Sequence, residues 1–483
     1  MNKRAFLILA FTPLLSPALF GGWSEMQRLT YRGNEINPQV VVRNDTVHVM
    51  WEQVSGAVSY IRSIDNGLTW GDVIDLTENG HTGTRANIVI TEGYLVTGWM
   101  DDNGAIALRY SANGSNWNAP IYKYTIDSQR YTFQCMAASG DTIYVAYWSS
   151  IRDSTDLMPY KFLRSPDCGQ TWSNLLTIGH NFISTLNMVL LFANNYLLLA
   201  ISTETGPGGF HILGYVSNNY GQTWSDTIWI SPRILPIAQQ PCISYNQING
   251  QFAVGYMDYR YQQYAFYGDI FIRISGDDPS QWISESQVTD EHTSKYPSVS
   301  FIGTSLKTVW ADRRYYSAGN DEIFFNSSED GGYSWDNPQR LTNTQSKSIY
   351  PSIFNVLDTI HVVWFEDDTT GNNSSDIYYI NYIPDSSDII NTNNLPPSLF
   401  TIYAYPNPFN STLSIDISAE KPGDVYISDI LGRFITELKY PKGISTIKWD
   451  ATDKTGKTLP SGAYFIKNKG GGFKDVLEVM YLK

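Results

Sequence analysis

Four acidic residues stand at one repeated position in this 483-residue sequence, two residues beyond an aromatic residue that closes an apolar run. They are Asp101, Asp258, Asp312 and Glu366. Carboxylates that meet at one place can donate and accept protons. We therefore consider Asp101, Asp258 and Asp312 as candidate acid or base catalysts, and Glu366 as a candidate ligand contact.

Cationic and aromatic residues accompany these acids. Arg260 and Arg314 each follow one of the aspartates by two residues, and Arg85 and Tyr350 are expected near the starts of neighbouring strands. A guanidinium group holds a carboxylate through two parallel hydrogen bonds, so these side chains could bind an anionic sugar. The alternative is that each aspartate bonds the backbone or the arginine of its own loop, and that the pattern is structural.

Other kinds of chemistry find no support in the sequence. It contains no metal-ligand spacing, phosphate loop or nucleophile elbow, so we expect no metal and no cofactor. His48 and His361 lie in apolar runs, where buried histidines with a hydrogen-bond partner are the simpler interpretation. A net charge of −14 argues against nucleic-acid binding. The three cysteines permit at most one disulfide.

The elements that position these residues recur along the chain. A serine, a short polar turn and a tryptophan repeat six times, at 63–70, 111–117, 165–172, 217–224, 275–282 and 328–335. In the clearest copies, such as SIDNGLTW, the aspartate can accept backbone N–H bonds, the glycine takes a positive φ and the tryptophan packs between sheets. We assign these turns a structural role and no chemistry.

Four short strands surround each turn, and this grouping predicts an all-β fold. The second strands end near Trp51, Trp99, Tyr147, Ala200, Tyr256, Trp310 and Trp364. Because there are seven such strands but six turns, we predict that residues 23–30 supply the fourth strand of the last unit, beside residues 376–383, and close a ring. This predicts a seven-bladed β-propeller, or a six-bladed one if the Leu-rich fourth unit is not a blade. The turns then lie on the face opposite the acids.

The recurring turns resemble the Asp-box, or BNR repeat, of sialidase-like β-propellers. In that family, three arginines hold the substrate carboxylate, an aspartate is the acid/base and a tyrosine assisted by a glutamate is the nucleophile. This sequence departs from that pattern. INPQVVV at residues 36–42 lacks the arginine of the family's Arg-Ile-Pro motif, and the family's enzymes have six blades. No Tyr and Glu pair can be assigned, so we do not carry the activity over.

A second domain is predicted over residues 398–483, after a polar linker at 385–397. Alternating strands with Gly and Pro turns indicate a small Ig-like β-sandwich. PNPFN at 406–410, Gly432 with Arg433, Trp449 with Asp450, and SGAY at 461–464 closely resemble the C-terminal sorting domain of the type IX (Por) secretion system. The resemblance implies contact with the export machinery and a secreted or outer-surface location. The alternative is an Ig-like spacer without a sorting role.

The start of the chain is typical of an export signal. Lys3 and Arg4 precede an apolar run over residues 5–20, which predicts a signal peptide at 1–22 and a propeller at 23–384. The alternative is a retained membrane anchor. After cleavage we expect no transmembrane span, because Asn194 and Asn195 interrupt the most apolar later segment, residues 187–201.

Three hypotheses of function follow from these features. The first is a secreted or cell-surface propeller that binds a glycan, a glycoprotein or another extracellular ligand through its acidic and arginine-bearing face. The second is an exo-sialidase-like glycoside hydrolase, and the third is a structural or adhesive scaffold. Arginines that converge beside a Tyr and Glu pair favour hydrolysis, whereas arginines paired with local aspartates favour binding or scaffolding.

Overall fold

A computed structural model describes most of the chain: residues 22–43, 45–78, 80–91, 93–123, 131–149, 158–174, 176–181, 185–205, 209–233, 238–261, 267–315, 320–356, 359–367, 374–383, 401–405, 409–419, 422–429, 433–468 and 476–483. Almost all of the expected signal peptide, the linker, Pro406 to Pro408 and Gly432 lie outside these residues. The chain divides into two compact units, Met1–Asp385 and Ser386–Lys483. In the described ranges the regular elements are all strands, and no helix there could span a membrane.

The described residues of the first unit form seven antiparallel sheets. In chain order they contain β3 (Glu35–Arg43), β4 (Thr46–Gln53), β5 (Val58–Ser63) and β6 (Ile74–Asp75); β7 (Gly83–Ile90), β8 (Leu95–Asp101), β9 (Ile106–Ser111) and β10 (Ile121–Lys123); β11 (Tyr131–Ser139), β12 (Thr142–Ser149), β13 (Met158–Ser165) and β14 (Leu176–Asn181); β15 (Thr185–Ala193), β16 (Tyr196–Glu204), β17 (Phe210–Ser217) and β18 (Ile228–Trp229); β19 (Ala238–Tyr245), β20 (Phe252–Asp258), β21 (Asp269–Ser275) and β22 (Trp282–Gln287); β23 (Ser294–Ile302), β24 (Ser305–Asp312), β25 (Glu322–Ser328) and β26 (Gln339–Arg340); and β27 (Lys347–Val356), β28 (Thr359–Asp367) and β29 (Ser375–Ile383) with β1 (Gly22–Trp23) and β2 (Gln27–Arg28).

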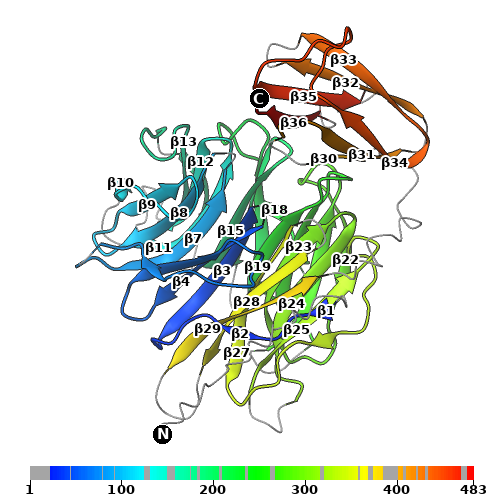
Figure 1. The fold of residues 1–483 in the computed structure, drawn as a ribbon. Coiled ribbons are helices and arrows are strands. Elements are labelled where there is room, and N and C mark those ends of the chain that lie inside the picture. Colours follow the sequence, from blue (N-terminus) through cyan, green and yellow to red (C-terminus); the bar gives the residue numbers. More distant parts are fainter. Residues whose placement is uncertain are drawn as a thin grey trace, which may run out of the picture. The chain divides into compact units, whose positions relative to one another are not determined.

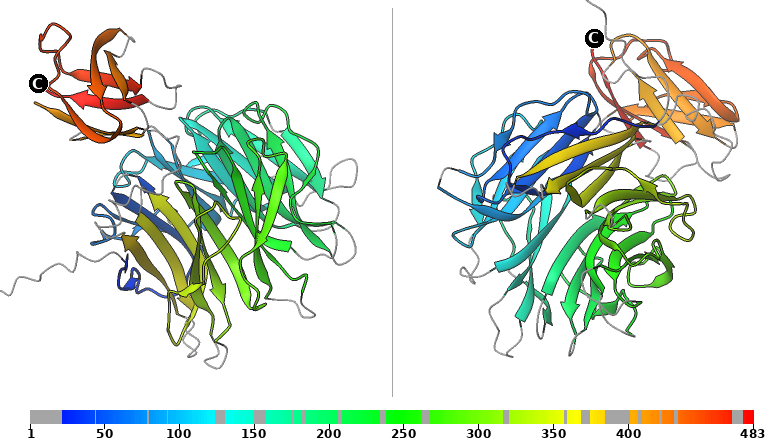
Figure 2. Two further views of the ribbon diagram at one scale, coloured as in Figure 1. Left: turned by 90° about the vertical axis from the view of Figure 1, so that its right-hand side faces the viewer. Right: turned by 90° about the horizontal axis from the view of Figure 1, so that it is seen from below.

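These sheets are arranged as a closed ring, which defines the unit as a β-propeller. The first strand of each sheet contacts the first strand of the next, and β27 contacts β3 to complete the circle. The last sheet, in yellow, therefore lies beside the first, in blue (Figures 1 and 2). The Leu-rich unit forms a full four-stranded sheet, β15 to β18, like its neighbours. Aromatic and aliphatic side chains fill the space between adjacent sheets, and Trp51, Trp99, Trp310 and Trp364 are almost fully buried there.

The ring is closed by the N-terminal segment, as the sequence predicted. β1 and β2 pair with β29, with Trp23 opposite Tyr382 and Arg28 opposite Tyr378. Beyond β2, the Thr30 hydroxyl accepts the Ile377 N–H at 2.9 Å and donates to Asp376 at 3.2 Å. The two ends of the propeller are thus held in one sheet, which leaves no unpaired edge on β29.

The repeated turns lie at the ring end where second strands begin, since the turn residue Ser63 pairs with Val47 at the start of β4. Within the turn, the Ser63 hydroxyl accepts the Gly67 N–H at 2.8 Å, and the Asp65 carboxylate accepts the Thr69 N–H at 2.8 Å. The turns at 165–172, 217–224 and 328–335 repeat this arrangement. In the Pro-containing copy, Ser275 instead accepts the Phe252 N–H at 2.9 Å.

Two buried histidines have tyrosine partners. His48 Nδ1 lies 2.6 Å from the Tyr60 hydroxyl, and His361 Nδ1 lies 2.8 Å from the Tyr379 hydroxyl. Burial lowers the pKa of each histidine to about 4. Both are core residues, as the apolar runs around them predicted.

The second unit consists of two antiparallel sheets around one core, an Ig-like sandwich. One sheet contains β30 (Thr401–Tyr405), β31 (Leu413–Ala419) and β34 (Gly443–Trp449), and the other contains β33 (Phe434–Tyr440), β32 (Gly423–Asp429), β35 (Gly462–Asn468) and β36 (Val476–Tyr481). Trp449 packs edge-on against Tyr464 at 5.4 Å in the middle of this core.

We predict that Thr30→Val destabilises the propeller by about 1–3 kcal/mol, because valine leaves the buried Ile377 N–H and one Asp376 oxygen without their partner. Urea unfolding measures the change, with the exposed Thr84→Val as the control. Equal unfolding midpoints for wild type and Thr30→Val would show that these two hydrogen bonds add nothing to stability.

The buried histidines make stability sensitive to acid. Because the folded pKa is lowered from 6.5 to about 4, the unfolded chain binds more protons between these values, and the free energy of unfolding falls as the pH drops through this window. His361→Gln should reduce this slope by up to about 1.4 kcal/mol per pH unit. His81→Gln is the control that should leave the slope in this window unchanged, since the pKa of His81 is raised from 6.5 and its contribution changes only above that pH. An unchanged slope in His361→Gln would contradict the assignment.

Candidate functional site on the first-strand rim

The candidate acids gather at one end of the ring, which we call the first-strand rim. It is the end where first strands begin and second strands finish, as in the pairs Gly83 with Asp101, Ala238 with Asp258, and Ser294 with Asp312. The recurring turns lie at the other end. The rim is therefore the part of the propeller where side chains of different sheets can act on one ligand.

Arg260 and Arg314 are engaged by acids of their own sheets. Arg314 Nη2 lies 2.9 Å from Asp312 Oδ2, and Arg260 Nη2 lies 2.7 Å from Asp258 Oδ2. The main-chain N–H of each arginine also donates to its aspartate, at 2.8 Å in both loops. Arg260 further bonds Glu285 at 3.0 Å. The structural alternative therefore describes these two loops, and both guanidinium groups are already occupied by carboxylates.

The surroundings of Asp312 suit an ion-pair partner better than a proton donor. Although burial opposes ionisation, the hydrogen bonds and charge of Arg314 outweigh it and lower the pKa of Asp312. Thr293, Ser294 and Trp310 also donate to this carboxylate, at 2.8 to 2.9 Å. Asp312 is therefore a saturated anion at neutral pH.

Glu366 occupies the same position in the next sheet, and its carboxylate also accepts hydrogen bonds from residues of its own sheet. Its Oε1 accepts bonds from the Ser348 hydroxyl at 2.7 Å and the Trp364 indole N–H at 2.9 Å. The residue is 6% exposed, and burial raises its pKa. These bonds join the first and second strands, so the structure gives Glu366 a role within its sheet.

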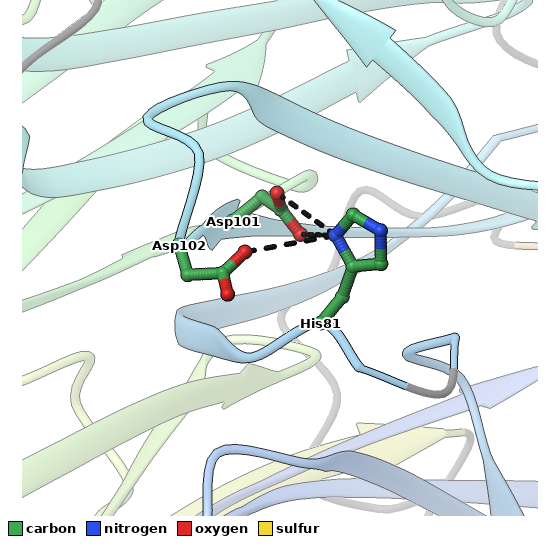
Figure 3. Close-up of side chains that lie close together, drawn as sticks. All are labelled: His81, Asp101 and Asp102. Atoms are coloured by element: carbon green, nitrogen blue, oxygen red, sulfur yellow. Dashed lines mark hydrogen bonds and ion pairs between the residues drawn. The ribbon is translucent and has the colours of Figure 1, made fainter.

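Asp101 meets a histidine that sequence reasoning did not select. His81 Nδ1 lies 3.2 Å from Asp101 Oδ1 and 3.6 Å from Asp102 Oδ1 (Figure 3). Asn103 also donates to Asp101 at 2.9 Å. The potential ligand atoms of His81, Asp101 and Asp102 all lie within 4.8 Å of one another. Among the described residues, they are the one cluster of histidine, cysteine or acidic side chains that could hold a metal ion. The hydrogen bond to Asp101 raises the pKa of His81.

A backbone feature of the rim was missed by sequence reasoning. Five residues in the first strands have a positive φ: Asn37 at 54°, Arg85 at 57°, Gln240 at 57°, Tyr296 at 55° and Tyr350 at 53°. Each lies in a β-bulge, where the register to the second strand shifts. A positive φ costs a non-glycine residue roughly 1 kcal/mol or more. Residues with such a strained backbone are found most often at functional sites. The available signal was proline, which follows four of the five.

Three of these bulged residues contact one another across sheets. The Tyr296 N–H donates to Gln240 Oε1 at 2.6 Å, and the Tyr296 ring stacks on the Tyr350 ring with centroids 3.7 Å apart. Tyr350 also stacks on Phe365 at 5.6 Å and remains 38% exposed. The bulges thus hold a pair of parallel tyrosine rings at the rim, with one ring open to solvent.

Polar groups surround this tyrosine pair. Lys295 Nζ lies 3.0 Å from Asp321 Oδ2 and 5.1 Å from the Tyr296 ring centroid. Arg313 Nε lies 3.1 Å from the same Asp321 carboxylate, and its guanidinium stands 4.3 Å over the Tyr267 ring. Two cations therefore share one buried carboxylate beside the aromatic pair.

Arg85 lies apart from these groups, on the β7 bulge. Its side chain is exposed and interacts with the charge of Glu52, a buried carboxylate that accepts the Ala86 N–H at 3.1 Å. Arg85 therefore lies near an acid of the neighbouring sheet.

Glu35 at the start of β3 was not selected from the sequence, although it lies beside the closing seam. It is 0% exposed, and neither carboxylate oxygen has a hydrogen-bond partner among the described residues. Burial, together with the nearby charge of Asp376, raises its pKa to about 7.

A comparison with protein families assigns the second unit. Residues 403–478 match the model of the secretion system C-terminal sorting domain. The unit is therefore a type IX sorting domain that interacts with that export machinery, and the chain is directed out of the cell to its outer surface. No curated protein matches the chain in sequence.

Solved structures similar to the chain include three carbohydrate-related proteins. An alpha-L-arabinanase from Penicillium chrysogenum, complexed with arabinobiose, is 11% identical, with 75% of this chain and 98% of that chain covered and a TM-score of 0.41. A mutant of Trypanosoma rangeli sialidase is 11% identical, with 96% and 88% covered and a TM-score of 0.45. Phage phi92 endosialidase is 10% identical, with 96% and 87% covered and a TM-score of 0.47.

We predict that Glu35 contributes a component of stability, up to about 3 kcal/mol, that is lost as the pH rises from 4.5 to about 7. The folded state holds this carboxyl protonated, so the stabilisation is complete below 4.5, the pKa of an ordinary glutamic acid. Glu35→Gln should remove this component, and the contributions of the two buried histidines cancel when variant and wild type are compared. Chemical unfolding across this pH range measures it, with the exposed Glu25→Gln as the control. Parallel profiles would contradict the prediction.

Proposed function

We propose that this protein is an exported, cell-surface β-propeller that binds an extracellular carbohydrate at the first-strand rim. The observation that carries this proposal is the Tyr296 and Tyr350 pair, stacked at 3.7 Å on two bulges with positive φ. Tyr350 is 38% exposed, and an aromatic ring that is held rigidly and is partly exposed can pack against the C–H face of a sugar at little entropic cost. The amide of Gln240 and the ammonium of Lys295 stand beside it and can bond hydroxyl groups.

The hydrolase hypothesis receives less support from the geometry. A tyrosine and a glutamate do meet next to an arginine, because the Tyr256 hydroxyl bonds Glu285 and Glu285 bonds Arg260. However, Tyr256 is 0% exposed, and burial together with the charge of Glu285 raises its pKa well above the usual value. A tyrosine nucleophile needs access to substrate and a phenolate that forms readily, and this group has neither.

The scaffold hypothesis predicts no ligand at the rim. Two features argue against the scaffold hypothesis. The backbone at Tyr296 and Tyr350 is strained, and such strain clusters at functional sites. A stacked pair that served packing alone would also gain nothing from an exposed ring. A glycan array distinguishes the scaffold hypothesis from carbohydrate binding directly, because only the latter predicts a signal.

We predict that the wild-type protein binds members of a printed glycan array and that Tyr350→Ala weakens this binding about tenfold or more, because the open stacking surface is lost. Tyr350→Phe keeps the ring and should retain most of the affinity. Tyr333→Ala removes a tyrosine of similar exposure, 48%, from a turn at the other end of the ring and is the matched control. A silent array, or equal binding by Tyr350→Ala and wild type, would refute the proposal.

A further inference from the structure

The rim carries exposed tyrosines outside the inner pair, at equivalent positions of neighbouring sheets. Tyr261 and Tyr315 each follow a second-strand aspartate, Asp258 or Asp312, by three residues, and they are 58% and 50% exposed. Tyr31 lies just beyond the closing strand β2 and is 75% exposed. One exposed ring thus falls on each of three successive sheets, from β19–β22 to the sheet that closes the ring.

Each of these rings has an aromatic or cationic neighbour. The Tyr315 ring stacks on Phe324 at 6.0 Å, and the Arg340 guanidinium lies 4.8 Å from its centroid. Tyr261 lies 6.3 Å from Phe271, and the Arg28 guanidinium lies 4.6 Å from the Tyr31 ring. An exposed ring that is held by such a neighbour is preorganised for contact, which a freely rotating surface tyrosine is not.

The cations near these rings are already neutralised. Arg340 Nη2 lies 2.7 Å from Glu322 Oε1, Arg28 pairs with Asp376, and the loops of Tyr261 and Tyr315 hold the ion pairs of Arg260 and Arg314 described above. The carboxylate side chains of Glu322, Asp376, Asp258 and Asp312 are 8% exposed or less, and that of Glu285, the second partner of Arg260, is 21% exposed. A carboxylated ligand would have to displace one of them and leave a buried charge without its partner, which is strongly unfavourable.

We infer that the ligand of this rim is an uncharged polysaccharide, which extends from the inner tyrosine pair along the outer rings of Tyr261, Tyr315 and Tyr31. This inference rests on the proposed function and adds the charge and the length of the carbohydrate. The hydroxyl groups of a neutral sugar can form hydrogen bonds with the outer oxygen lone pairs and N–H groups of an ion pair without breaking it. A ligand carboxylate instead competes with the protein's own carboxylate for the guanidinium group. The net charge of −14 further disfavours polyanions.

Affinity electrophoresis of the full mature chain tests this inference, with gels that contain neutral polysaccharides (starch, galactan, arabinan, xylan) or acidic ones (polygalacturonate, alginate, hyaluronate). We expect retardation in at least one neutral gel and in no acidic gel. We also expect the dissociation constant to change less than about twofold between 50 and 500 mM NaCl, because no ion pair forms on binding. Retardation by acidic polymers alone, or a strong dependence on salt, would overturn the inference.

Variants separate the outer rings from the inner pair. Tyr261→Ala and Tyr315→Ala should each weaken binding to the retained polysaccharide about fivefold or more, and should leave binding of its disaccharide unchanged. Tyr350→Ala should weaken both. Tyr220→Ala, at 43% exposure in a turn at the other end of the ring, is the matched control, and thermal unfolding checks that all variants fold.

The outcomes distinguish the two proposals. If Tyr350→Ala alone weakens binding, the ligand occupies only the inner pair, and the extended chain is wrong while the proposed function stands. If no gel retards the wild type and the glycan array is silent, the carbohydrate function itself fails. Capture of a protein partner through the outer tyrosines, without any carbohydrate binding, would replace both.

Discussion

The structure of the propeller depends on the bonds that join its two ends. Asp376 accepts bonds from Thr30 and Arg28, and the Ile377 N–H is satisfied by Thr30, so the final sheet is complete only when the N-terminal segment is in place. An open ring would expose the edge of β29 and leave these polar groups buried without partners. Each sheet needs a neighbour on both sides to cover its apolar faces, so closure at one seam stabilises all of them.

Hydrogen bonds and ion pairs within each sheet also determine the electrostatics of the rim. The repeated acids are satisfied within their own sheets: Asp312 by Arg314 and Ser294, and Glu366 by Ser348 and Trp364. Beside the tyrosine pair, Lys295 and Arg313 share the single carboxylate of Asp321. The rim is therefore dense in charges that bond one another, and it also exposes aromatic rings.

Several features could be predicted from the sequence because they are local or strictly repeated. Asp101, Asp258 and Asp312 recur two residues beyond the aromatic residue near the end of their second strands, so they were correctly expected at one end of the ring. The turn at Ser63 is set by hydrogen bonds within five residues. The pairing of residues 23–30 with 376–383 followed from counting, since one unit lacked its fourth strand.

The sequence by itself determined the all-β architecture, the order of strands, the export signature of the tail and the end of the ring at which side chains could meet. Only the tertiary structure decided which of these residues are open to a ligand. Arg260 and Arg314 resemble carboxylate-binding residues in the sequence, yet each is held by its own aspartate. Tyr296 and Tyr350 are 54 residues apart, and they meet because bulges in adjacent first strands turn both rings to one place. Stacking across sheets depends on backbone geometry at sub-ångström precision, and no local pattern of residue types encodes that.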